Sequence, residues 1–136
     1  MQVQPYLFFN GKCEEALEFY KKMLGAKVTM AMRFGDVPDP EARAAGPANN
    51  IMHSEFQVGE TTLMASDGMG KDKPNFQGFS LTIQCASDAE VTRLFHALRE
   101  GGQVEMPLAK TFFASNFGGV RDKFGVSWMV INPIRM

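Results

Sequence analysis

The sequence predicts an α+β fold built from two copies of one module. Two stretches of the chain, residues 14–28 (EEALEFYKKMLGAKV) and residues 89–104 (AEVTRLFHALREGGQV), each run from an amphipathic helix through a glycine into an apolar strand. Tyr20 then aligns with Phe95, a separation of about 75 residues in a chain of 136. A period this long indicates a duplicated supersecondary unit rather than a solenoid.

The first half contains a helix pattern and four strand patterns. Apolar residues recur every three or four positions in the helix, acidic residues open it, basic residues close it, and a glycine follows it. Alternating apolar residues between turn signals indicate the strands, and Gly59-Glu60 indicates a hairpin between the last two. The sequence therefore predicts a helix at 13–24 and strands at 3–9, 26–34, 51–58 and 61–66.

The second half repeats this order. Ser87 is a good N-cap for the next helix, and Gly101-Gly102 ends it. Each half is thus βαβββ, and strand runs that share one helix per half are typical of an α+β domain. The predicted elements are a strand at 79–84, a helix at 88–100 and strands at 103–108, 112–121 and 126–132.

The domain organisation follows from two segments of low apolar content. Residues 68–77 carry the glycine, proline and charge of a linker, so we expect a single domain, 1–136, with modules at about 1–67 and 78–136. Residues 35–50 contain three prolines and predict a long loop with one helical turn at 40–45. Loops of this length are often lids or dimer arms.

Composition excludes several classes of protein. The 14 basic and 15 acidic residues give a net charge of −1 without a basic run, which argues against nucleic-acid binding. No apolar run approaches the roughly 20 residues of a membrane span. The first residues lack a signal-peptide pattern, so we expect a cytoplasmic protein. Of two cysteines, Cys13 begins a helix. It is interpreted either as a small buried thiol or as a reactive thiol whose pKa the helix lowers.

Three stretches carry a family resemblance: PYLFFNGKCEEALEFY, HSEFQVGETTLMASD and KTFFASNFGGVRDKFGVSWMVIN. They resemble the PhnB-like subgroup of the vicinal oxygen chelate superfamily, which includes glyoxalase I, extradiol dioxygenases and fosfomycin- and bleomycin-resistance proteins. The resemblance implies that both modules form a U-shaped mixed sheet around a cleft, and it implies a homodimer. The subgroup is often labelled as similar to a demethylubiquinone methyltransferase, and this sequence gives that label no support of its own.

The resemblance also implies where a metal would be held. Enzymes of the superfamily bind a divalent ion with four side chains, usually His, Glu or Gln, one from each of four strands. Aligned on the flanking motifs, these positions are occupied here by Pro5, Met64, Ser80 (or its neighbour Phe79) and Met129. A one-residue shift brings Gln4 to the first position but supplies no carboxylate or imidazole at the second or fourth. We therefore expect no metal and no cofactor.

A cleft with thioethers at its centre suits an apolar or aromatic small molecule. The expected ligand-binding residues are Met64, Ser80, Met129, Trp128 and Phe112. His53 and Glu55 alternate along one predicted strand, so they share a face and are candidate catalytic residues.

Three hypotheses remain open from the sequence. The first is a metal-free binding protein for a small molecule. The second is a lyase or isomerase with a rearranged site around His53 and Glu55. The third is an interaction or regulatory subunit whose cleft is vestigial.

Overall fold

The computed structural model describes residues 1–68 and 73–134, and these form two compact units, Met1–Pro74 and Asn75–Met136. Each unit contains one four-stranded mixed sheet, and the sheet orders are β1-β4-β3-β2 and β5-β8-β7-β6. The predicted α+β class is confirmed. No helix in the described residues is long and apolar enough to span a bilayer.

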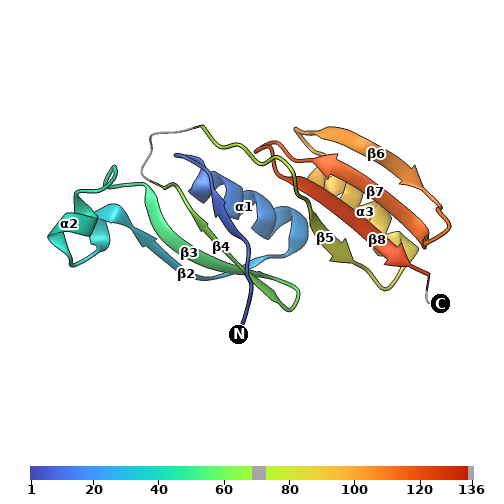
Figure 1. The fold of residues 1–136 in the computed structure, drawn as a ribbon, viewed down its shortest axis with the longest axis horizontal. Helices are drawn as coiled ribbons and strands as arrows, with labels where there is room; N and C mark the ends of the chain where they lie inside the picture. Colours follow the sequence, from blue (N-terminus) through green and yellow to red (C-terminus); the bar gives the residue numbers. More distant parts are fainter. Residues whose placement is uncertain (69–72, 135–136) are drawn as a thin grey trace. The chain divides into compact units, whose positions relative to one another are not determined.

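The first unit follows the predicted order of elements (Figure 1). The helix and the hairpin have the bounds that their patterns predict. The first strand is shorter than predicted because Pro5 lacks an N–H group, although its carbonyl still accepts a hydrogen bond of 2.9 Å from the Met64 N–H. The elements are β1 (Tyr6–Phe8), α1 (Cys13–Leu24), β2 (Lys27–Arg33), η1 (Phe34–Asp36), α2 (Pro40–Arg43), β3 (Ile51–Val58) and β4 (Thr61–Ser66).

The second unit repeats this arrangement. Ser87 caps its helix as predicted, because its hydroxyl accepts a hydrogen bond from the Glu90 N–H. The helix ends two residues earlier than predicted, and the first and third strands each begin two residues later. The elements are β5 (Leu81–Gln84), α3 (Asp88–Leu98), β6 (Gln103–Ala109), β7 (Ala114–Arg121) and β8 (Ser127–Pro133).

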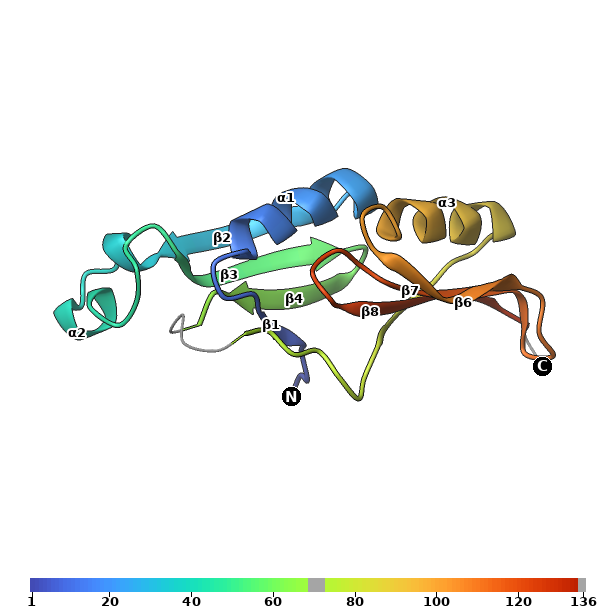
Figure 2. The ribbon, with the colours of Figure 1, turned by 90° about the horizontal axis from the view of Figure 1, so that it is seen from above.

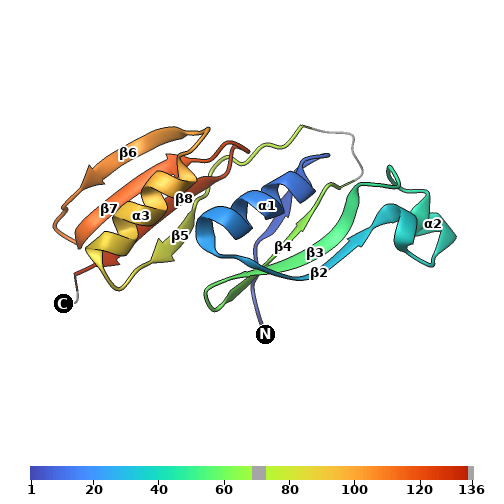
Figure 3. The ribbon, with the colours of Figure 1, turned by 180° about the vertical axis from the view of Figure 1, so that it is seen from behind.

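One helix packs on one face of the sheet in each unit (Figures 2 and 3). In the first unit the Tyr20 ring of α1 stacks on Phe56 of β3, with centroids 5.8 Å apart, and both residues are fully buried. In the second unit the Phe95 ring of α3 lies directly on Gly118 of β7, where no side chain intervenes. The core of each unit therefore lies between its helix and its sheet.

The segment between β2 and β3 is folded rather than irregular throughout. The predicted helical turn is present as α2, and η1 precedes it. Phe34 is buried, and its ring lies so close to Gly46 that a side chain there would collide with it. The predicted linker at 68–77 includes residues 69–72, which lie outside the described residues.

Candidate functional site

The first sheet has one covered face and one open face. Phe56 and Ser54 of β3 point toward α1 and are fully buried, so the alternate residues His53 and Glu55 lie on the opposite face. They are two positions apart on β3, and the His53 Nε2 and Glu55 Oε2 atoms are 3.5 Å apart. The two side chains share one face of the strand, as the sequence predicts. Their catalytic role stays a prediction.

Thioethers surround these two residues. Met64 of β4 lies opposite Glu55, and on its other side it lies opposite Tyr6 of β1. On β2, Met30 lies opposite Glu55 and Met32 lies opposite His53. Directly opposed residues point to the same face of a sheet, so three methionines border the histidine–glutamate pair. All three are half-buried.

Tyr6 completes a hydrogen-bonded chain on this face. Its hydroxyl lies 2.7 Å from His53 Nδ1, so the side chain reaches across β4, which separates β1 from β3. The Tyr6 ring also stacks on Phe8, with centroids 4.9 Å apart and an interplanar angle of 19°. Partial burial raises the pKa of the Tyr6 phenol above 10.0, and the charge of Glu55 acts in the same direction. Tyr6 is therefore a protonated hydrogen-bond donor at neutral pH.

The sequence did not reveal this contact. Tyr6 and His53 are 47 positions apart, and their meeting depends on β1 pairing with β4 rather than with its neighbour in the chain. A signal exists only in the alternation of Tyr6 and Phe8 with the buried Leu7, which predicts that both rings share the open face. We name Tyr6, Phe8, Met30, Met32, His53, Glu55 and Met64 the open face of the first sheet.

The four positions that the sequence alignment predicts for a metal carry no adequate set of donors. Pro5 has no side-chain donor, and Met64 and Met129 offer only neutral thioethers. The Ser80 hydroxyl is 2.8 Å from the Ser127 hydroxyl and is engaged there. In residues 1–68 and 73–134, no three His, Cys, Asp or Glu side chains are grouped to hold an ion. The residues present do not fit the metal that the superfamily uses.

Ser80 belongs to a polar network on the second sheet, and Met129 lies on the same face. Ser127, two residues before Met129 and therefore on its face, donates a hydrogen bond of 2.6 Å to Glu105 of β6. Arg121 of β7 forms an ion pair of 3.2 Å with the same carboxylate. The network joins β6, β7 and β8 with Ser80, the residue that precedes β5, and each of these four polar residues is at least partly satisfied by another.

Two other expected ligand-binding residues lie elsewhere. Trp128 is adjacent to Met129, so it points to the opposite side of β8. Its indole is 2% exposed and donates a hydrogen bond of 2.9 Å to buried Asp122. Phe112 lies in the turn before β7 and is 87% exposed. Trp128 and Met129 therefore do not line the same face, and the role of Phe112 stays a prediction.

Cys13 is a buried thiol. Its side chain is fully buried at the start of α1, with its sulfur 3.9 Å from the Ser54 hydroxyl. Burial raises the pKa of the Cys13 thiol to about 12, and the nearby Asp67 carboxylate adds to the shift. This burial favours the interpretation as a small buried thiol over that of a thiol activated by the helix start.

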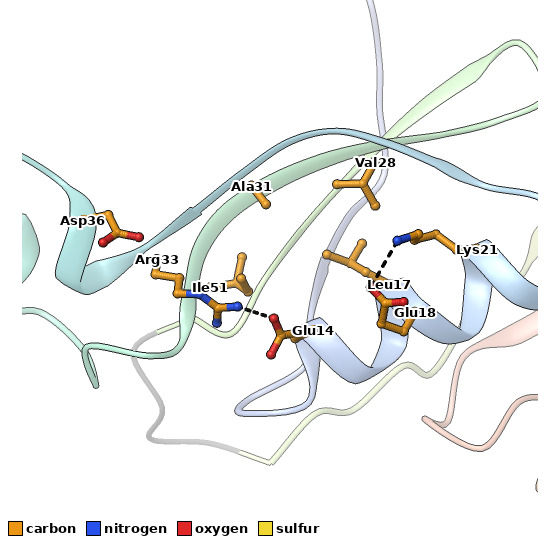
Figure 4. Close-up of a pocket in the computed structure, with 9 residues that line it drawn as sticks. All are labelled: Glu14, Leu17, Glu18, Lys21, Val28, Ala31, Arg33, Asp36 and Ile51. Atoms are coloured by element: carbon orange, nitrogen blue, oxygen red, sulfur yellow. Dashed lines mark hydrogen bonds and ion pairs between the residues drawn. The ribbon is translucent and has the colours of Figure 1, made fainter.

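A hollow of about 240 Å³ lies between α1 and β2 (Figure 4). Leu17, Val28 and Ile51 form its apolar floor. Two ion pairs, Glu14 with Arg33 and Glu18 with Lys21, lie along its rim, so its charged groups are largely satisfied by one another. The residues expected to bind a ligand or catalyse a reaction do not line it.

Comparison with known proteins places the chain in a family. A family model described as 3-demethylubiquinone-9 3-methyltransferase matches residues 1–131. Protein YjdN of Escherichia coli is 34% identical over 138 residues, covering 96% of this chain and 94% of YjdN.

Solved structures agree with this placement. Protein PA1353 from Pseudomonas aeruginosa is 44% identical with a TM-score of 0.85, and the match covers 97% of both chains. A PhnB protein from Bacillus cereus is 28% identical with a TM-score of 0.80, covering 97% of this chain and 99% of that one. The fosfomycin resistance protein FosX from Mesorhizobium loti shares the fold, with a TM-score of 0.66 at 9% identity. The resemblance inferred from the sequence is confirmed. The chain belongs to the family described as 3-demethylubiquinone-9 3-methyltransferase, the PhnB-like subgroup of the vicinal oxygen chelate superfamily.

Proposed function

We propose that the chain binds a small apolar or aromatic molecule on the open face of its first sheet, without a metal ion. The observation that carries the proposal is the ring of Met30, Met32 and Met64 around His53 and Glu55. Thioethers are polarizable and adapt their shape to apolar ligands, and a few fixed polar groups among them set the ligand's orientation.

The aromatic side chains of β1 extend this apolar surface. Tyr6 is 37% exposed and Phe8 is 53% exposed, and their stacked rings present a wall beside Met64. Covering such surface with a ligand contributes roughly 25 cal/mol for each Å² of apolar area removed from water. The same residues argue against a divalent ion, since thioethers and rings are poor donors to one.

A thermal-shift screen of the full chain tests this proposal. Aromatic compounds are expected to raise the melting temperature equally in a chelator and in added zinc, nickel or manganese. Met64→Gln is expected to abolish that response, because it places an amide at the centre of the apolar surface. Met23→Gln is the matched control, because Met23 is a half-buried residue of α1 outside the open face, and this variant is expected to retain the response. Stabilisation only in the presence of a metal would overturn the proposal.

A second function is favoured by the chain Tyr6–His53–Glu55. A carboxylate accepts from the imidazole and the imidazole accepts from the phenol, which is the arrangement in which an imidazole takes the proton of a hydroxyl group in acid–base enzymes. In a lyase or isomerase, His53 Nδ1 would take the proton of the Tyr6 hydroxyl, the imidazolium would be paired with Glu55, and the phenolate oxygen would remove a proton from the substrate carbon beside a carbonyl. The methyl transfer named in the family description is not carried to this chain, because these contacts argue for binding and proton transfer.

Deuterium exchange tests the enzymatic alternative. In D₂O, an enzyme of this kind would catalyse exchange of the hydrogens beside the carbonyl of a small apolar ketone, as followed by NMR. Tyr6→Phe is expected to remove that activity while leaving ligand-induced stabilisation in place. Absence of exchange above the blank would favour a binding protein. The homodimer and the cytoplasmic location expected from the sequence remain part of the main proposal.

A further inference from the structure

The open face of the first sheet combines a carboxylate with apolar surroundings. The Glu55 side chain is 40% exposed, and Met64 and Met30 lie directly opposite it on the two neighbouring strands. The His53 imidazole is its neighbour, with Nε2 at 3.5 Å from the carboxylate, which is long for a hydrogen bond. A carboxylate held among thioethers is less hydrated than one on an open surface, so its attraction for a cation is stronger.

The hydrogen-bonded chain leaves the carboxylate's charge in place. In the neutral imidazole that satisfies both contacts, Nε2 carries the proton and faces Glu55, while Nδ1 accepts from the Tyr6 hydroxyl. The Tyr6 hydroxyl proton then points toward His53, and the His53 Nε2 proton points toward Glu55. Lys27 lies on the same face, opposite Gln57, and in the described part of the chain it forms no ion pair with Glu55. Around Glu55 the face therefore offers acceptors and a negative charge, while the Lys27 charge lies beside Gln57.

Aromatic ring faces lie beside this charge. Tyr6 shares the register row of Met64 and Glu55, and Phe8 stacks on Tyr6. Ring faces attract organic cations, and the attraction increases when the site is partly desolvated. A carboxylate, two rings and three thioethers together complement one kind of ligand, an ammonium group on an apolar skeleton.

We propose that the ligand of the open face is an organic cation, a protonated amine attached to an apolar or aromatic group. This inference rests on the proposed binding function and names the chemical class of its ligand. Glu55 pairs with the ammonium group, Tyr6 and Phe8 contact its charged end or its ring, and the methionines cover the apolar skeleton. A ligand of the same shape with a carboxylate meets the charge of Glu55 and is excluded.

Calorimetric titration of the full chain with three matched probes tests the proposal at pH 7.5. The probes are 2-naphthylmethylammonium, 2-naphthylmethanol and 2-naphthoate, which share one ring system and differ in charge. The ammonium probe is expected to bind about tenfold more tightly than the alcohol, as one partly desolvated ion pair with a ring contact allows. The carboxylate probe is expected to show no binding.

Two variants locate the preference. Glu55→Gln keeps the size of the side chain and is expected to bring the affinity for the ammonium probe down to that for the alcohol. Glu60→Gln, in the exposed β3–β4 turn, removes the same charge from the same unit and is expected to leave the preference intact. Phe8→Leu is expected to lower the affinity for the ammonium probe more than the affinity for the alcohol.

The outcomes separate this inference from the function on which it rests. Binding of all three probes with equal affinity, or a preference that survives Glu55→Gln, overturns the cation proposal and leaves apolar binding standing. Failure of every probe to bind overturns both. An equal loss of preference in Glu55→Gln and Glu60→Gln shows a general effect of net charge and also overturns the cation proposal.

Discussion

At the scale of single residues, buried carboxylates hold distant parts of each unit together. Asp67, just after β4, accepts hydrogen bonds from the N–H groups of Gly11, Cys13 and Ile51 at 2.7, 2.9 and 2.8 Å. It thereby fixes the start of α1 and the start of β3 with one side chain. Asp122 does related work in the second unit, where it accepts from Phe124, Val126 and the Trp128 indole.

Asp67→Asn is expected to lower the free energy of unfolding by about 1–3 kcal/mol. An amide presents an N–H group where the carboxylate presents an acceptor, so at least one buried backbone N–H loses its partner. Denaturant unfolding measures the change. Asp39→Asn on the exposed surface serves as the control and is expected to alter stability little. Equal effects of the two substitutions would contradict the structural role of Asp67.

The Cys13 thiol makes stability depend on alkaline pH. Its pKa in the folded chain is about 12, against an ordinary value of 9.0. Below pH 9 both states hold the proton. As the pH rises from 9 toward 12, the unfolded thiol ionises first, so the free energy of unfolding falls by up to about 1.4 kcal/mol per pH unit. Denaturant unfolding of wild type and Cys13→Ala between pH 8 and 10.5 measures this effect. The free energy of unfolding is expected to decline less steeply with pH in the variant. Equal declines in the two proteins would contradict a role for the Cys13 thiol.

At the scale of elements, the sequence predicted what local patterns determine. The bounds of α1 and of the β3–β4 hairpin follow from a clear helical period and a turn signal, and both predictions were right. β1 is shorter than predicted because Pro5 has no backbone N–H group to donate to the neighbouring strand. The Tyr6–His53 contact was out of reach, since it depends on which strands become neighbours, and alternation along one strand does not reveal that order.

The packing of α3 on β7 depends on one glycine. A Cβ atom on Gly118 would lie 2.8 Å from the buried Phe95 ring, whereas one on Gly119 would meet the flexible end of Met106 at 2.8 Å. Gly118→Ala is therefore expected to destabilise the chain by about 1–3 kcal/mol. Gly119→Ala, on the opposite face of the same strand, is expected to cost less because the methionine can move. Thermal or denaturant unfolding distinguishes them, and a larger cost at Gly119 would contradict this account.

At the scale of the whole molecule, the same strand order occurs twice. Each sheet places its first strand beside its last, and each carries one helix on one face. The two open faces nevertheless differ in chemistry. The first gathers thioethers and rings around His53 and Glu55, while the second joins Ser80, Ser127, Glu105 and Arg121 in a polar network. The duplication thus preserved the scaffold and changed the side chains on it.

Self-association is expected at this scale as well. Strands β2 and β6 form edges of the two sheets, and β6 exposes Val104 and Met106. Exposed edges of this kind are commonly covered by a partner. Sedimentation velocity at micromolar concentration is expected to show a homodimer, and a monomer across that range would contradict the prediction.

The order of strands also sets the moment at which the open face of the first sheet can form. β4 lies between β1 and β3, and it is the last strand of its unit in the chain. During synthesis the ribosome releases Tyr6 long before Met64, so the N-terminal segment has no strand to join until β4 emerges. The phenol then meets the imidazole in the same step that closes the sheet, and the open face of the first sheet is therefore among the last parts of its unit to be assembled.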